Sequence, residues 1–159
     1  MVWPLQSRTT VPSPGESATE AFWLASGLAL AVQAWKGFSA FFRTGRWNIR
    51  RFVQTGGMPS SHAASVSALT TTVGLNDGFR STMFAVTLFF SLIVMYDAAG
   101  LRRAAGQHAT VLNRLIDEHF RDQHDTHRLM ELLGHTPLEV LVGALIGVAT
   151  SMAWDRLFG

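Results

Sequence analysis

The sequence of 159 residues contains no cysteine, which excludes disulfide bonds and thiolate metal sites. Charged residues make up 15% of the chain, whereas soluble proteins carry about 25%. The 13 basic residues include a single lysine, Lys36, and the arginines are scattered among acids. The chain therefore lacks the basic stripe of a nucleic-acid-binding protein. Hydrophobic residues reach 48%, and this content with so little charge indicates a membrane protein.

The length allows one domain. Residues 1–20 contain three prolines among hydroxyl side chains and carry no apolar run of signal-peptide length. We therefore expect a loose N-terminal segment over residues 1–20 and a single membrane domain over residues 21–159.

Four segments have the composition of membrane-embedded helices, and they are residues 21–42, 58–75, 81–95 and 138–154. Three of them are strongly apolar, and about 20 apolar residues span a bilayer. Residues 58–75 are rich in serine, threonine and small residues, which is typical of an inner helix packed between others. Gly143 and Gly147 form a GxxxG pattern that predicts a helix-packing face.

The charge pattern predicts the orientation. Arg43, Arg46, Arg50 and Arg51 form the strongest positive cluster and mark a cytoplasmic loop by the positive-inside rule. Residues 97–133 have the pattern of an amphipathic helix on the cytoplasmic surface. We therefore expect an all-α polytopic bundle of about four membrane-embedded helices plus this helix, in the bilayer of a bacterial inner membrane. The tract 118–128 holds three histidines; metal binding is one reading, and we favour a solvated polar loop.

The loop Gly56-Gly57-Met58-Pro59-Ser60-Ser61-His62 has the residue types of an anion site at a helix start. Glycine allows close backbone approach, Pro59 suits the first helical turn, and N–H groups there attract negative charge. Ser60 and Ser61 offer hydroxyl donors, and His62 can donate a proton near neutral pH. A glycine turn followed by a helix cap and a surface histidine explains the same residues equally well.

Further polar residues fall at the cytoplasmic helix ends of this topology, namely Lys36, Arg43, Asp97, Arg102, Arg103, His135 and Glu139. A lysine in such a position commonly snorkels to the interface, and this is the default expectation for Lys36. Asp97 is either a helix-end charge or an ion-pair partner of Arg102 or Arg103. Glu139 has a favourable place near a helix N-terminus through the macrodipole alone.

The spacing KxxxxxxR of Lys36 and Arg43 and the sequence PSSH at residues 59–62 resemble motifs of the type-2 phosphatidic acid phosphatase (PAP2) and vanadium haloperoxidase superfamily. More specifically, the stretches GGMPSSHAASVSAL, VMYDAAGLRRAAGQHATVLN and ELLGHTPLEVLVGALIG resemble the divergent PAP2 family. The similarity extends over residues 36–147.

The resemblance implies roles for these residues. His62 would protonate the leaving oxygen, and phosphate would be held by Lys36, Arg43, Gly57, Ser60 and Ser61. The third superfamily motif, SRxxxxxHxxxD, is not present as written, so two histidines stay open as the nucleophile. His135 has an acid, Glu139, one turn later; His108 has Arg102 at the right spacing but Leu112 in place of the acid. We favour His135, with Arg102 or Arg103 supplying the missing cation and Asp97 in support.

The resemblance thus implies a membrane phosphatase that hydrolyses a lipid-linked phosphate monoester or diphosphate through a phosphohistidine, without metal or cofactor. Its partners would be the bilayer, the phosphate-bearing lipid and a second copy or a larger membrane complex, with no nucleic acid. The incomplete third motif, and Thr44 where the superfamily has proline, favour an alternative, a catalytically inactive accessory subunit. Vanadate-dependent haloperoxidation uses the same oxyanion cradle, but a membrane setting makes it remote.

Overall fold

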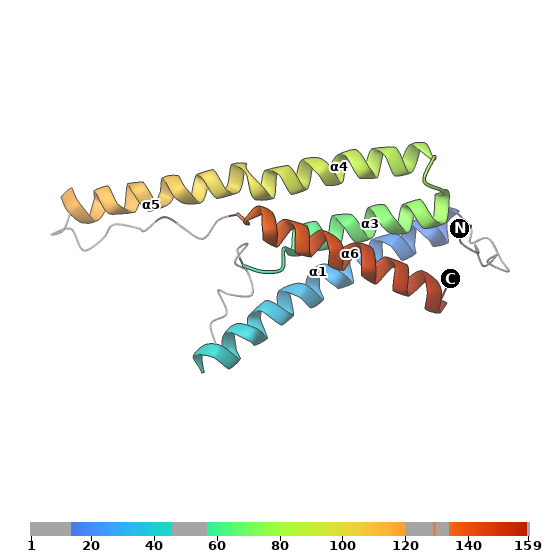
Figure 1. The fold of residues 1–159 in the computed structure, drawn as a ribbon, viewed down its shortest axis with the longest axis horizontal. Helices are drawn as coiled ribbons and strands as arrows, with labels where there is room; N and C mark the ends of the chain where they lie inside the picture. The colour runs from blue at the N-terminus through green and yellow to red at the C-terminus, as the bar shows by residue number, and fades with distance from the viewer. Residues whose placement is uncertain (1–13, 46–56, 120–128, 130–133, 159) are drawn as a thin grey trace.

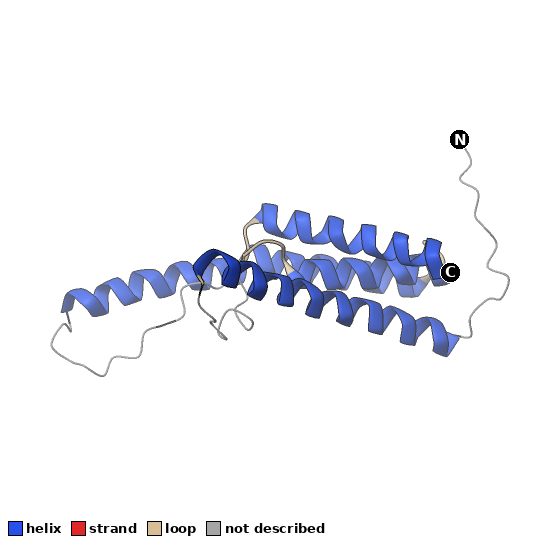
Figure 2. Ribbon diagram, turned by 90° about the horizontal axis from the view of Figure 1, so that it is seen from below, coloured by secondary structure: helices blue, strands red, loops and turns tan. Residues whose placement is uncertain are grey.

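The protein is helical throughout the part of the chain that the computed structural model describes, which comprises residues 14–45, 57–119, 129 and 134–158 (Figures 1 and 2). No strand occurs over these residues, as the all-α prediction requires. The helices are α1 (Pro14–Thr44), α3 (Ser61–Asp77), α4 (Thr82–Ala99), α5 (Leu101–His119) and α6 (Pro137–Phe158). Helix α1 begins before the predicted residue 21, because Pro14 is well suited to a first helical turn.

Helix α3 lies at the centre of the bundle and contacts α1, α4 and α6 (Figure 1). More than half of its residues are buried, and most of these are alanine, serine or threonine. The predicted inner position of residues 58–75 is therefore confirmed. The prediction that Pro59 occupies the first turn is wrong, because Ser60 caps the helix and places Pro59 before it. Gly78, with φ +89°, ends the helix in a conformation that favours glycine.

The bundle has its polar side chains inside and its large apolar side chains outside. The buried hydroxyls of Thr70 and Ser91 lie 2.6 Å apart and join α3 to α4. Ser151 of α6 donates to the carbonyl oxygen of Ala68 at 3.0 Å. On the outer face of α4, by contrast, Phe89 is 68% exposed. Small polar contacts between helices and apolar outer faces are the arrangement of a protein embedded in lipid.

The predicted GxxxG face packs α6 against α3. A Cβ atom added to Gly143 would collide with the carbonyl oxygen of Ser60, and one added to Gly147 would collide with that of Ala64. Glycine at both positions is what lets the two helix backbones approach so closely. The start of α3, which carries His62, is thereby held against α6.

Two helical segments among the described residues are long and apolar enough to cross a membrane, Thr82–Glu118 and Pro137–Phe158. They include residues 82–95 and 138–154 of the predicted membrane helices. Residues 21–42 are helical as expected, and the helix predicted over residues 58–75 begins at Ser61, three residues later than predicted. Their membrane location stays a prediction.

Helix α5 continues the line of α4 and projects beyond the rest of the bundle (Figures 1 and 2). It is amphipathic, as predicted for this region. The side-chain amide of Asn113 makes two 2.9 Å hydrogen bonds with the backbone of Leu129, which fixes that residue beside the helix. Three features discussed above lie outside the described residues: residues 1–13, the arginines Arg46, Arg50 and Arg51, and nearly all of the histidine-rich tract.

Candidate functional site

His62 is the second residue of α3, and the cap of that helix fixes its position. The Ser60 hydroxyl accepts a hydrogen bond from the backbone N–H of Ala63 at 3.3 Å. The backbone N–H of Ser60 in turn donates to the carbonyl oxygen of Glu139 at 3.1 Å. A serine N-cap of this kind stabilises a helix start by about 1 kcal/mol. Because Ser60 also bonds to α6, the two helix starts that carry His62 and Glu139 lie together.

His135 reaches the same place from the segment that precedes α6. Its backbone N–H donates to the carbonyl oxygen of Ala98, the last turn of α4, at 2.9 Å. Gly134, with φ +85°, lies so close to the backbone of Arg102 and Arg103 that a Cβ atom there would collide with it. The junction of α4 and α5 therefore holds His135 in place, and its side chain is 2% exposed.

Glu139 orients the His135 ring. The Glu139 carboxylate accepts from the backbone N–H of Thr136 at 3.0 Å, and the Thr136 hydroxyl accepts from the backbone N–H of Glu139 at 3.3 Å. This reciprocal pair is a capping box. The same carboxylate oxygen lies 3.3 Å from His135 Nδ1. The Nδ1 atom therefore faces the carboxylate, which leaves Nε2 as the nitrogen available for chemistry.

The two imidazoles pack edge to face, with ring centroids 6.1 Å apart and an interplanar angle of 62°. The atoms His62 Nδ1 and His135 Nε2 are both buried without a hydrogen-bond partner among the described residues. Buried polar atoms in proteins are nearly always paired, so these two imidazole nitrogens are candidates to bind a polar ligand.

Lys36 of α1 is 9% exposed, and its ammonium nitrogen is likewise buried without a partner in the described part of the chain. The expectation that Lys36 snorkels to the interface is therefore wrong, because the helices around α1 cover its head group. Its charge interacts with Glu139 and with His135. A buried cation beside two imidazoles is an electrostatic environment that favours an anion.

Burial lowers the pKa of His135 below its ordinary value of 6.5, and the positive charge of Lys36 lowers this pKa further. The hydrogen bond and charge of Glu139, and the backbone of Gly57, raise it again but do not reverse the shift. His135 is therefore a neutral imidazole at pH 7. The neutral form is the one in which Nε2 has a free electron pair.

The two arginines at the start of α5 lie at the rim of this cluster. Arg102 Nε donates to the Asp97 carboxylate at 2.6 Å across the Gly100 junction, which makes Asp97 an ion-pair partner and not merely a helix-end charge. Arg102 and Asp97 are close enough for their charges to act on His62. Arg103 is exposed.

The remaining predicted residues are Ser61, Gly57, Arg43 and His108. Ser61 donates its hydroxyl hydrogen bond to Gln33 of α1 at 3.3 Å, so both serine side chains of the loop make contacts within the protein. Gly57, with φ +87°, is exposed beside the start of α3. Arg43 lies in α1, but its side chain is outside the description. His108 is exposed on α5, and it is His135 whose ring contacts His62.

Sequence reasoning missed three residues that build the site, Gly134, Thr136 and Gln33. Gly134 and Thr136 had a readable signal, a glycine followed by T-x-x-E before an apolar run, in which the glutamate is the predicted Glu139. Gln33, which joins α1 to Ser61, had none beyond being polar in an apolar helix. Among the described residues, no group of three histidine, cysteine, aspartate or glutamate side chains is arranged to hold a metal ion.

Comparison with known proteins places this chain in context. A family model described as the divergent PAP2 family matches residues 18–150. The uncharacterized membrane protein YuiD of Bacillus subtilis (strain 168) is 44% identical over 116 residues, which cover 65% of this chain and 73% of YuiD. No solved structure matches the chain significantly.

Proposed function

Because the chain belongs to the divergent PAP2 family, we propose that it is a membrane phosphatase acting on a lipid-linked phosphate monoester or diphosphate. The observation that carries this proposal is a set of three buried nitrogen atoms, Lys36 Nζ, His62 Nδ1 and His135 Nε2, that have no hydrogen-bond partner among the described residues. Together they offer a positive charge and two imidazoles to one guest. A phosphate group has the negative charge and the acceptor oxygens that satisfy such a set.

In the proposed reaction, the electron pair of His135 Nε2 attacks phosphorus and forms an N–P bond while the bond from phosphorus to the leaving oxygen breaks. The negative charge of the bound phosphate favours the protonated form of His62, which gives its proton to that oxygen. A water molecule then transfers a proton to His62 and attacks phosphorus, and the N–P bond breaks. Phosphate leaves, His135 is neutral again and His62 is again protonated, so the cycle closes.

The surrounding residues stabilise charge in this reaction. Glu139 keeps the Nδ1 proton on His135 and offsets the positive charge that develops on the ring during attack. Lys36 neutralises the phosphoryl oxygens, and the positive end of the α3 dipole lies at the same end of that helix. Arg102 and Arg103 at the rim suit the second phosphate of a diphosphate.

We propose further that four helices, α1, α3, α4 and α6, are embedded in the bacterial inner membrane with the site facing the cytoplasm. The cysteine-free chain allows a direct test, because His108→Cys and Asp77→Cys each introduce one exposed thiol, at opposite ends of the bundle. A membrane-impermeant maleimide should label position 108 only from the cytoplasmic side and position 77 only from the other. The reverse pattern would refute the orientation.

Phosphate release by purified protein in vesicles tests the activity. The substrates are a long-chain phosphatidic acid and a lipid diphosphate, and the variants are His62→Gln, His135→Gln and His108→Gln. Loss of a general acid lowers a rate by about 10²–10⁴-fold, so His62→Gln should fall by this amount, and His135→Gln should form no phosphoenzyme. The exposed His108→Gln is the matched control and should keep wild-type turnover. Equal background release by all four proteins would refute the proposal.

A further inference from the structure

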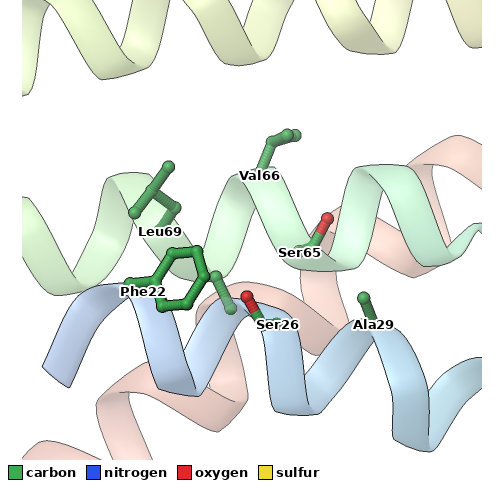
Figure 3. A pocket seen from close by; sticks show the side chains of 7 residues that line it. Phe22, Ser26, Ala29, Ser65, Val66 and Leu69 are labelled. Carbon is green, nitrogen blue, oxygen red and sulfur yellow. The ribbon is translucent and has the colours of Figure 1, made fainter. Parts of the chain in front are cut away.

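An apolar groove of about 220 Å³ runs along the seam between α1 and α3. Phe22, Ser26 and Ala29 line it from α1, and Ser65, Val66 and Leu69 line it from α3 (Figure 3). Its walls are therefore small or apolar side chains, and no charged residue lines it. The Phe22 ring, packed edge to face on Trp23 at 5.2 Å, bounds the groove at the end farthest from the histidines.

The groove and the phosphate site follow one another along the same seam. The hydrogen bond from Ser61 to Gln33 joins α1 and α3 between them. On α1, Ala29 lies four residues, or about 6 Å of helix, to one side of that bond, and Lys36 lies three residues to its other side. On α3, Ser65 lies four residues beyond the bond, and His62 is the residue next to it. An amphiphile with its charge at Lys36 would therefore have its apolar part directed toward the groove.

We propose that this groove holds the hydrocarbon chain of the lipid whose phosphate is bound at Lys36, His62 and His135. The inference rests on the proposed function for the identity of the headgroup. From His62 to Leu69 is seven residues, or about 10 Å at 1.5 Å per residue, so only a long-chain lipid reaches the far end. The substrate class is thus a long-chain lipid phosphate rather than a short, water-soluble phosphate ester.

The lining of the groove favours a hydrocarbon chain, because it offers an occupant only small or apolar side chains. Inside a bilayer, apolar contact with protein or with lipid is nearly equivalent, so the groove orients the chain and the cationic site supplies the affinity. Occupancy should therefore depend on the phosphate, and this distinguishes a bound substrate from ordinary surrounding lipid.

Photolabelling of the full chain tests this dependence. Vesicles of phosphatidylcholine would contain a phosphatidic acid with a diazirine midway along its chain. We expect label on α1 and α3 residues of the groove, removed by excess unlabelled phosphatidic acid and unaffected by diacylglycerol. Label spread over the exposed faces of α4 and α6, or label that phosphatidic acid does not displace, would overturn the inference.

A filled groove provides the second arm. Ala29→Phe should lower groove labelling about tenfold, equivalent to about 1.4 kcal/mol, and lower the preference for long-chain over short-chain phosphate esters in kcat/KM by a similar factor. The matched control is Ala85→Phe, at an exposed alanine of α4, which should label like the wild type. Unchanged labelling of Ala29→Phe, or crosslinking of a photoreactive residue at position 26 to a second copy of the chain, would overturn the inference.

The two proposals can fail separately. A protein that releases no phosphate but binds phosphatidic acid in the groove would remove the phosphatase and leave the lipid site. A protein that releases phosphate from lipids without displaceable groove label would keep the phosphatase and remove the groove as its chain-binding site.

Discussion

Replacing Gly143 by alanine tests how the two helix starts of the site are held together. A Cβ atom at this position would collide with the carbonyl oxygen of Ser60 and lie 3.2 Å from both the Ser60 carbonyl carbon and the Ala63 Cβ. Glu139 lies one turn earlier in α6, and its carbonyl oxygen accepts the hydrogen bond from Ser60. The added methyl group therefore pushes α6 away from α3. This displacement occurs next to the hydrogen bond between Ser60 and Glu139, which aligns Glu139 with the start of α3.

The magnitude follows from the distances. Carbon atoms in contact are normally about 3.5–4.0 Å apart, so α6 must move by several tenths of an ångström from the carbons and farther from the oxygen. Overpacking of this kind costs about 1–3 kcal/mol. Alanine recovers up to about 1 kcal/mol of helix propensity, which leaves a net loss of up to about 2 kcal/mol. At about 2–4 °C per kcal/mol, Tm should fall by up to roughly 8 °C.

The control is Gly27→Ala in α1, because a Cβ atom there has nothing within 4 Å. This variant should match the wild type or gain up to about 1 kcal/mol. Tm would be measured by thermal unfolding in detergent micelles, with phosphate release as a second readout. A displacement of about 1 Å can cost 10²-fold in rate, so activity should fall more steeply than stability. Equal Tm values for Gly143→Ala and Gly27→Ala would refute the described packing of α6 on Ser60.

Three more predictions concern the site. Because the pKa of His135 is lowered in the folded protein, the unfolded chain binds its proton first as the pH falls below about 6.5. Stability is thus retained above that pH and lost below it, and Tm should drop more between pH 7 and pH 5 in the wild type than in His135→Gln. Gly134→Ala should cost about 1–3 kcal/mol, because its φ of +85° and the backbone at the start of α5 both oppose a side chain; an unchanged Tm would contradict this. Lys36→Met removes an unpaired buried charge, so it should raise Tm in the absence of substrate by about 2 °C or more. Phosphate release should be lost in the same variant. A lower Tm would argue for a hidden partner of the ammonium group.

The fold class was predictable because it depends on local patterns. The GxxxG sequence and the small-residue helix appear where the sequence indicated them. The relative direction of α4 and α5 could not be predicted from local patterns. Gly100 separates the two helices, and a glycine between helical segments is compatible with a sharp turn as well as with a straight continuation. The structure has the straight continuation, and the location of α5 on the membrane surface stays a prediction.

The site was only partly predictable, since its residues come from four separate segments. Spacing along the chain left His108 and His135 both open, because a motif interrupted by loops carries no information on distance. The contact of Gly134 with the start of α5 brings His135 to His62, and that contact depends on tertiary packing. Lys36 illustrates the same limit. A lysine snorkels when water is within reach of its side chain, and only the packed bundle shows that its head group is covered.

The three unpartnered nitrogen atoms also explain why the framework around them is joined so closely. An unsatisfied buried polar group costs about 1–3 kcal/mol and an unpaired charge more, whereas total folding stability is only about 5–15 kcal/mol. Each helix start at the site is accordingly fixed by more than one bond: Ser60 caps α3 and binds Glu139, and Glu139 caps α6 and orients His135. A ligand that satisfies the three nitrogen atoms removes the cost and stabilises the protein by RT ln(1 + [L]/Kd), where [L] is the free ligand concentration. In the proposed function, the free energy that the three unpaired nitrogen atoms cost is recovered when an oxyanion binds to them. This links the buried polar contacts and apolar outer faces of the bundle to the chemistry proposed for its polar end.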